Sequence, residues 1–198
     1  MSREDSYHHG DLRRALLDAA AQLIQEKGSA GASLREVARR AGVSHAAPYR
    51  HFASKEALLA SIAEEGFEQL RIVLEEAAAG KAPLDALRDT GCAYIEFAIA
   101  HPGYFRVMFS PEAGAPCDYP SLVAASRGAF GVLVRTIQSC IEAGEVRDEP
   151  AGELALVAWS CVHGLSTLIL DGMLEEAGTP DRLAQLVTSH LANGLRTP

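Results

Sequence analysis

The 198-residue sequence contains none of the short motifs that carry common enzyme chemistry. It has no His-Glu-x-x-His, no Gly-x-Ser-x-Gly, no phosphate-binding P-loop and no Gly-x-Gly-x-x-Gly. The adjacent acidic residues are typical of solvated helix faces: Glu64-Glu65, Glu75-Glu76 and Glu175-Glu176. We therefore expect no enzymatic activity and no cofactor.

The four cysteines form neither a Cys-x-x-Cys pair nor a Cys/His pair at zinc-finger spacing. Cys117 lies among prolines, and the others lie in apolar helical stretches, where a cysteine is usually a small buried hydrophobe: Cys92, Cys140 and Cys161. We expect reduced thiols, no metal site and a cytoplasmic location.

Long hydrophobic runs are also missing. We find no apolar run that approaches the roughly 18 residues of a membrane span. The mixed charges of residues 1–5 do not resemble a secretory signal. We expect no contact with a membrane.

An excess of basic residues is absent as well, since the net charge is −8. The charge is unevenly distributed, however. Residues 1–60 contain nine Lys/Arg and seven Asp/Glu, a net charge of +2, together with four histidines. Residues 61–198 contain nine Lys/Arg and nineteen Asp/Glu, a net charge of −10. A surface compatible with phosphate is therefore expected at the N-terminal end.

Two short helical patterns occupy residues 33–52. Ser33 and Glu36 form a capping box at the start of the first pattern. Gly42 follows its end, where glycine adopts a left-handed conformation without penalty. Ser44 then serves as the N-cap of the second helix. This arrangement predicts a helix-turn-helix, with a generic helical hairpin as the alternative.

The second of these helices has a composition that suits DNA better than a hydrophobic core. Residues 45–51 combine small residues with aromatic and basic hydrogen-bonding side chains. A helix in the major groove needs small residues for close approach and donors for base edges and phosphates. We interpret Pro48 as a rigid apolar contact with the first helix. The alternative is a polar face that only contacts solvent.

Residues 42–52 and 54–59, which read Gly-Val-Ser-His-Ala-Ala-Pro-Tyr-Arg-His-Phe and Ser-Lys-Glu-Ala-Leu-Leu, resemble the DNA-binding signature of TetR-family transcriptional regulators. The resemblance extends from Leu12 to Leu59, and Pro48 departs from it because many members have an aliphatic residue there. It implies that five side chains meet the groove: Arg35, Ser44, His45, Ala47 and Tyr49. It also implies that Tyr49, His51 and Lys55 hold phosphates.

Lys55 has a separate physical basis for this role. It follows the N-cap Ser54, and a helix N-terminus beside a lysine favours an anion. The alternative is an ordinary solvated ion pair with Glu56. His8 and His9 similarly form either a phosphate-contacting arm or a frayed terminus.

Helical patterns continue to the C-terminus, with glycine and proline at the breaks. We expect helices at residues 11–27, 54–78, 84–100, 104–109, 121–143, 150–176 and 180–193, besides the two of the helix-turn-helix. The predicted fold class is thus all-α, with about nine helices. Residues 1–59 form a three-helix DNA-binding domain, and residues 60–198 form a helical effector-binding and dimerisation domain.

The last two helices are apolar over a wide arc, so more than one face requires covering. The resemblance implies a homodimer through residues 150–176 and 180–193, which would space two reading helices for a palindromic operator. Residues 159–164, Trp-Ser-Cys-Val-His-Gly, resemble the signature of the TetR C-terminal type named for Trp, His and Gly.

The resemblance also implies a pocket for a small hydrophobic effector, which would be mostly apolar with a few polar groups. For each candidate lining residue, ordinary core packing is the alternative. His163, one helical turn after Trp159, is the first polar candidate, although a core histidine fits equally well. The candidates are Tyr94, Phe97, Tyr104, Phe105, Met108, Trp159 and His163.

The predicted function is a ligand-responsive transcriptional regulator, in this family most often a repressor, that binds double-stranded operator DNA as a homodimer. The effector would release it from DNA by favouring another conformation. Two alternatives stay open: an all-α enzyme or carrier that binds an apolar small molecule without binding DNA, and a protein–protein adaptor.

Overall fold

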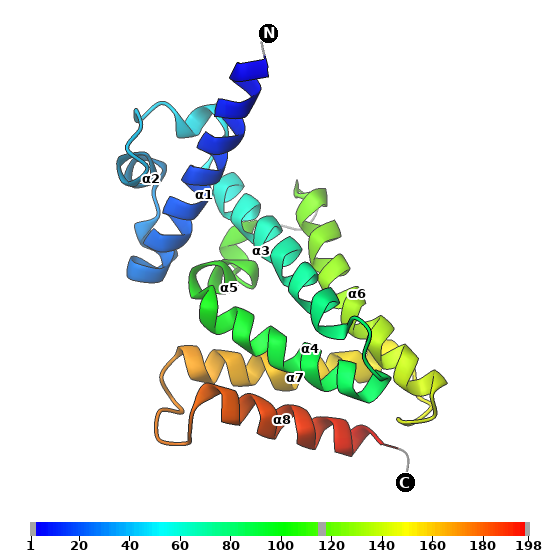
Figure 1. Ribbon diagram of the computed structural model, residues 1–198. Helices are drawn as coiled ribbons and strands as arrows, with labels where there is room; N and C mark the ends of the chain where they lie inside the picture. Colours follow the sequence, from blue (N-terminus) through cyan, green and yellow to red (C-terminus); the bar gives the residue numbers. More distant parts are fainter. Residues whose placement is uncertain (1–2, 115–117, 197–198) are drawn as a thin grey trace. The chain divides into compact units, whose positions relative to one another are not determined.

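The described chain is helical throughout, as the sequence predicts (Figure 1). This computed structural model describes residues 3–114 and 118–196, with side chains from Leu12 onward except at Ala30. These residues form eight α-helices, two 3-10 helices and, instead of strands, one isolated bridge between Val146 and Arg196. The elements are α1 (Arg3–Gly31), α2 (Leu34–Arg40), η1 (Pro48–Arg50), α3 (Lys55–Ala78), α4 (Pro83–Ala100), α5 (Pro102–Met108), η2 (Pro111–Ala113), α6 (Pro120–Glu142), α7 (Ala151–Leu170) and α8 (Pro180–Leu195).

Two compact units make up the chain. The first unit contains Met1–Gly66 and Pro102–Val123, and the second contains Phe67–His101 and Ala124–Pro198. Helices α3 and α6 each contribute residues to both units. The first unit therefore extends beyond the predicted DNA-binding domain of residues 1–59, because it includes α5 and η2.

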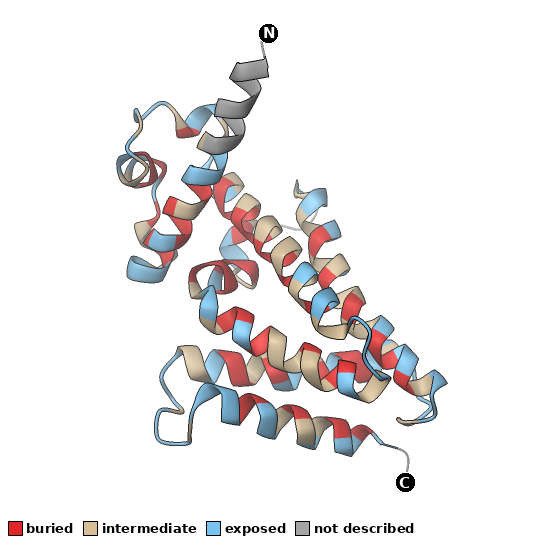
Figure 2. Cartoon of the chain, viewed as in Figure 1, coloured by how far each residue is buried: buried red, intermediate tan, exposed pale blue. Residues whose placement is uncertain are grey.

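In the first unit, α1 packs against α2 and α5. Its apolar face is fully buried at Leu16, Leu17 and Leu23, and Figure 2 shows the buried bands along the helix. Burial of each leucine contributes about 2 kcal/mol. Helix α5 approaches α1 so closely that a side chain at Gly103 would collide with the backbone carbonyl of Ala21. The glycine therefore permits α5 to dock on α1.

In the second unit, α4 packs against α7 and α8 (Figure 1). Helices α4 and α8 meet at Gly91, where an added Cβ would lie 2.7 Å from the Cγ2 atom of Thr188. A second group of buried side chains joins α4, α6, α7 and the end of α8: Leu87, Ile137, Cys140, Val146, Leu154, Ala155, Ala158 and Leu195.

The cysteines only partly match the expectation of buried thiols. Cys140 is buried, and burial raises the pKa of its thiol to about 11, so it is unreactive at neutral pH. Cys92 is half-buried, with its Sγ atom 3.4 Å from the Oγ1 atom of Thr188. Cys161 is exposed, so the prediction of burial is wrong there. Cys117 lies outside the described residues.

The first helix begins earlier than predicted. Helix α1 starts at Arg3, so Asp11 lies inside the helix and is not its N-cap. His8 and His9 also lie in α1, and their side chains are outside the described part of the chain. Gly28 interrupts the helical backbone with φ 71°, next to the predicted end at residue 27.

Helix α7 ends at Leu170, before the predicted end near residue 176. Gly172 adopts φ 72°, and its N–H donates to the carbonyl of Ile169 at 3.0 Å. The N–H of Met173 donates to the carbonyl of Leu168, also at 3.0 Å. These two bonds form the capping arrangement that commonly ends a helix at glycine.

The expectation that no apolar run reaches the length of a membrane span is wrong for α7. This helix has 20 residues and a mean hydropathy of 1.5, enough by length and composition to cross a membrane. Core helices meet the same criterion. Here α7 packs against α4 and α8 with one side and leaves apolar residues exposed on the other.

Candidate nucleic-acid interface and effector region

The first helix of the predicted helix-turn-helix forms as expected. The hydroxyl of Ser33 accepts a hydrogen bond from the N–H of Glu36 at 3.2 Å. Gly42 has φ 68°, and Val43 N–H donates to the carbonyl of Ala38 at 3.0 Å. The capping box is only half formed, because the Glu36 carboxylate bonds to Arg39 and Lys27.

The second helix is not an α-helix, so this part of the prediction is wrong. Residues 44–51 form successive i→i+3 bonds: Ala47 N–H to Ser44 O at 2.9 Å, and His51 N–H to Pro48 O at 2.9 Å. The second of these bonds closes the 3-10 helix η1. Pro48 has no N–H to bond the carbonyl of Ser44, so the α-helical ladder cannot pass this residue. Ser44 therefore does not act as the N-cap of an α-helix.

Pro48 itself is buried, and η1 packs against α2. This matches the interpretation of Pro48 as an apolar contact with the first helix. The residues around it face solvent: Tyr49 is 55% exposed, and His45 and Arg50 are exposed. The segment of residues 44–51 is thus anchored by its proline and exposes Ser44, His45, Tyr49 and Arg50, whereas His51 is half-buried.

The predicted DNA-binding residues differ in exposure. Arg35 on α2 and Ser44 are exposed like His45 and Tyr49, whereas Ala47 is half-buried. His51 is half-buried, with its ring centroid 6.2 Å from that of Phe52. All of these residues belong to the first unit, and all except Arg35 lie close together in residues 44–52.

Lys55, at the start of α3, is half-buried. The predicted cap forms, because Ser54 Oγ accepts from Ala57 N–H at 3.1 Å. The Nζ atom of Lys55 lies 3.9 Å from an Oε atom of Glu112 on η2. The acidic neighbour is therefore Glu112 rather than the Glu56 considered from the sequence.

Several cations of the first unit are neutralised by nearby carboxylates. Arg39 donates to Glu36 at 2.6 and 2.9 Å, and these bonds lower the pKa of the Glu36 carboxyl to about 2. Arg40 donates to Glu26 at 2.7 Å, which holds the pKa of Glu26 below its usual value. These arginines are poorly available to phosphate.

Arg50 is a candidate that the sequence analysis did not include among the DNA-binding residues. Arg35 and Arg50 are exposed, and neither forms an ion pair with a carboxylate among the described side chains, unlike Arg39 and Arg40. The guanidinium of Arg13 lies 5.8 Å from the ring centroid of Phe52. Ion pairs distinguish Arg50 from Arg39 and Arg40, and ion pairs cannot be predicted from residue type alone.

The predicted effector-binding residues lie in both units. Tyr104, Phe105 and Met108 are buried on α5 of the first unit. The Tyr104 hydroxyl donates to Asp18 at 3.2 Å, and burial is the main cause that raises its pKa. Met108 packs on Gly66, where a Cβ would lie 2.7 Å from its sulfur. These three residues serve the core of the first unit.

Four other candidates lie in the second unit, and three of them form a polar group. The Nε1–H of Trp159 donates to the hydroxyl of Tyr94 at 3.1 Å. That hydroxyl lies 2.8 Å from Nδ1 of His163. Phe97 instead packs on His101, with ring centroids 4.9 Å apart. Burial raises the pKa of Tyr94 and lowers that of His163, so both groups are neutral near pH 7.

A small cavity of about 30 Å³ adjoins this group and is lined by Tyr94 and Trp159 with mostly apolar neighbours. A cavity of this size has room for a water molecule but not for an organic effector. Its other lining residues are Leu74, Leu87, Thr90, Gly91, Leu133, Ala158, Val162, Thr188 and Leu191.

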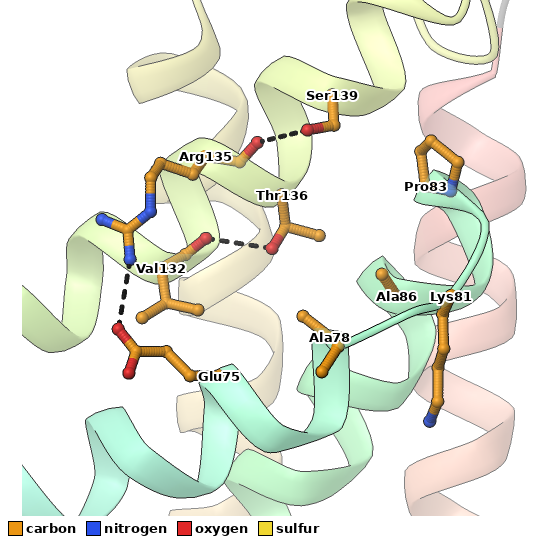
Figure 3. Close-up of a pocket in the computed structure, with 10 residues that line it drawn as sticks. Glu75, Ala78, Lys81, Pro83, Ala86, Val132, Arg135, Thr136 and Ser139 are labelled. Carbon is orange, nitrogen blue, oxygen red and sulfur yellow. Dashed lines mark hydrogen bonds and ion pairs between the residues drawn. The ribbon is translucent and has the colours of Figure 1, made fainter.

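A larger open cleft of about 350 Å³ lies between the end of α3, the start of α4 and α6 (Figure 3). Ala78, Ala86 and Val132 provide an apolar surface, while Arg135 bonds to Glu75 at 3.4 Å. None of the seven predicted effector residues is among those that line this cleft. Its charged groups are already paired within the chain.

Helices α7 and α8 expose several large apolar side chains on the second unit: Leu156, Val157 and Leu168 on α7, and Leu186 on α8. Cys161, on α7, is also exposed. Monomeric proteins seldom expose such a group of large apolar residues without a partner.

An outward-facing helix-turn-helix-like segment on one helical unit, joined to a second helical unit with an apolar cavity, defines a DNA-binding regulator. Two family models agree with this class. Bacterial regulatory proteins of the tetR family match residues 16–62, and the tetracyclin repressor-like C-terminal domain matches residues 87–191. The chain belongs to the TetR family of transcriptional regulators.

Individual relatives span nearly the whole chain. An uncharacterised helix-turn-helix transcriptional regulator of Mycobacterium tuberculosis is 26% identical over 92% of this chain and 81% of its own length. A protein of unknown function from Rhodococcus is 35% identical, covering 96% of this chain and 98% of that one, with a TM-score of 0.81. The TetR-family regulator PfmR from Thermus thermophilus shares the fold at 23% identity, with a TM-score of 0.76 over 92% and 99% of the two chains.

Proposed function

We propose that this regulator reads DNA through residues 44–51 and the exposed face of α2. The observation that carries the proposal is the exposure of His45 and Tyr49 on a segment anchored by the buried Pro48. Such a segment presents donors and an aromatic ring without the cost of moving a core residue. Groove contacts are assigned to Arg35, Ser44, His45, Ala47 and Tyr49, and phosphate contacts to Tyr49, His51 and Lys55.

We also propose that residues 1–59 act as the DNA-binding domain and residues 60–198 as the effector-binding and dimerisation domain. The protein acts in the cytoplasm, where it meets DNA. Two copies pair through the exposed apolar faces of α7 and α8, as supported by Leu156, Leu168 and Leu186. A two-fold dimer presents two reading segments to a palindromic operator.

The effector in this proposal is a small hydrophobic molecule bound near Tyr94, Trp159 and His163. Because the cavity there holds about 30 Å³, a ligand must enlarge it by displacing helices of the second unit. A ligand that binds the enlarged form better shifts the population toward it. We propose that this form no longer matches the operator, so the effector releases a repressor from DNA.

Footprinting on the promoter region of the protein's own gene tests the DNA-binding proposal. We expect protection of a palindromic sequence, with an affinity that falls steeply as the salt concentration rises. Sequence-selective protection would support the proposed function as a DNA-binding regulator. Absence of protection at low salt, together with tight binding of an apolar small molecule, would support an all-α carrier or enzyme instead.

A further inference from the structure

Glu112 connects two parts of the first unit that are far apart in sequence. Its Oε1 atom accepts a hydrogen bond from the hydroxyl of Ser29 at 2.8 Å. Its Oε2 atom lies 3.9 Å from the Nζ atom of Lys55. One carboxylate is therefore held between the end of α1 and the first residue of α3.

The backbone around Glu112 is fixed as well. The hydroxyl of Ser110 accepts from the N–H of Glu112 at 3.1 Å and begins η2. Gly114 then adopts φ 90°, and a Cβ there would lie 2.5 Å from both the Glu56 carboxylate and the Tyr119 ring. The segment that carries Glu112 thus fits closely around the first turn of α3.

Lys55 differs from the other paired cations of the first unit in the segment of the chain that supplies its acidic partner. Arg39 and Arg40 pair with Glu36 and Glu26, which belong to α2 and α1. Among the described ion pairs of Arg14, Lys27, Arg39, Arg40 and Lys55, only that of Lys55 takes its acid from Pro102–Val123. Both ends of that segment continue directly into the second unit, through α4 and α6.

We propose that Glu112 is an internal competitor of DNA phosphate at Lys55, and this inference rests on the proposed DNA-binding function. A carboxylate and a phosphate repel each other, so the Glu112 charge beside the ammonium group weakens the attraction of Lys55 for a phosphate. Binding of DNA at Lys55 therefore opposes the ion pair with Glu112, whose carboxylate the hydrogen bond from Ser29 helps to hold in place. A change in the second unit that moves either end of Pro102–Val123 therefore alters DNA affinity through this carboxylate.

The test uses the full-length protein and a 30-base-pair duplex of random sequence, with binding followed by fluorescence anisotropy between 50 and 200 mM NaCl. Glu112→Gln removes the charge and keeps an oxygen that accepts from Ser29. We expect it to bind about two- to fivefold more tightly than the wild type at the lowest salt. The gain shrinks as the salt concentration rises, because salt screens charges near the surface.

Two further variants make the result specific. Asp118→Asn removes the same charge from the same segment and is expected to give a smaller gain or none. Lys55→Ala weakens binding, and Glu112→Gln is expected to have no effect when added to it, since the competition requires both residues. Ser29→Ala, which frees the carboxylate on one side, should give a gain smaller than that of Glu112→Gln.

The outcomes separate this inference from the proposed function. Equal affinity of the wild type and Glu112→Gln, or an equal gain in Asp118→Asn, overturns the role of Glu112 and leaves DNA binding in place. A gain that persists in the Lys55→Ala background overturns it too. If neither the wild type nor Glu112→Gln binds the duplex at 50 mM NaCl, both proposals are wrong.

Discussion

Both units of this chain carry ion pairs at their surfaces, and they differ in the polar groups that contact their buried side chains. In the first unit, the hydroxyl of the buried Tyr104 donates to the carboxylate of Asp18 at 3.2 Å. In the second unit, the central polar group is uncharged and joins Trp159, Tyr94 and His163 by hydrogen bonds. The buried hydroxyl of the first unit thus bonds to a carboxylate, whereas neutral hydrogen-bonding groups lie beside the small apolar cavity of the second unit.

Close helix contacts allow the strongest comparison of the two units. Gly103→Ala is expected to destabilise the protein by about 3 kcal/mol, because the new methyl group meets the backbone carbonyl of Ala21, which cannot rotate away. Gly91→Ala in the second unit should cost about 1 kcal/mol, since it meets the side chain of Thr188. Urea unfolding measures both. Gly152→Ala, at a position with open space, serves as the control and should not destabilise. Equal losses at Gly103 and Gly91 would contradict this account.

Tyrosine hydroxyls give the next largest expected effect. Tyr94→Phe removes the partner of both Trp159 and His163 and should cost about 2 kcal/mol of unfolding free energy. Tyr104→Phe removes a single bond to the half-buried Asp18 and should cost about 1 kcal/mol. Chemical denaturation followed by the fluorescence of Trp159, the single tryptophan of the sequence, compares the two variants. A larger loss for Tyr104→Phe would mean that the polar group of the second unit is not structurally important.

The paired and unpaired arginines of the first unit predict different DNA affinities. Arg50→Ala removes an exposed cation and should weaken binding to all sequences about fivefold, lowering the salt slope by about 1. Arg39→Ala should have little effect on affinity, because its charge is already neutralised by Glu36. Anisotropy titrations at several salt concentrations measure both values. The same loss in both variants would show that the ion pair with Glu36 opens on DNA.

The smallest expected effect is a pH dependence of the second unit. Burial lowers the pKa of His163 below 6.5, so the unfolded chain takes up its proton first as the pH falls. The contribution of neutral His163 is complete above pH 6.5 and is lost as the pH falls through that value toward the folded pKa. His163→Gln should flatten the thermal stability profile in this range. The Glu36 contribution of the first unit is lost only between pH 4.5 and about 2, well outside that window. An unchanged profile in His163→Gln would contradict the assignment.

Much of the fold follows from local signals. Ser33 and Ser54 cap helices where the sequence predicts, and Gly42 takes its left-handed conformation. These features depend on neighbouring residues, so residue type and spacing are sufficient to predict them. The prediction of a regular short helix after Gly42 is wrong, because Pro48 removes a backbone hydrogen bond that an α-helix there would need.

Packing between residues that are distant in the sequence could not be predicted from the hydrophobic pattern. Nothing local to Gly103 indicates that a side chain there would meet Ala21, so the sequence places α5 in the effector-binding domain of residues 60–198. The pairing of Lys55 with Glu112 depends on the same docking. Most candidate DNA-binding residues lie close together in the sequence, so a local motif identifies them. The effector candidates share only their residue types, and they lie in two different units.

The central claim is that residues 44–51 contact DNA bases, and one ratio tests it most directly. The affinity of the protein for its footprinted operator is divided by its affinity for a scrambled duplex of equal length, in the wild type and in His45→Ala. We expect His45→Ala to lower this ratio by about five- to tenfold while its affinity for the scrambled duplex stays the same. An unchanged ratio in His45→Ala, measured on a folded protein, would contradict the claim.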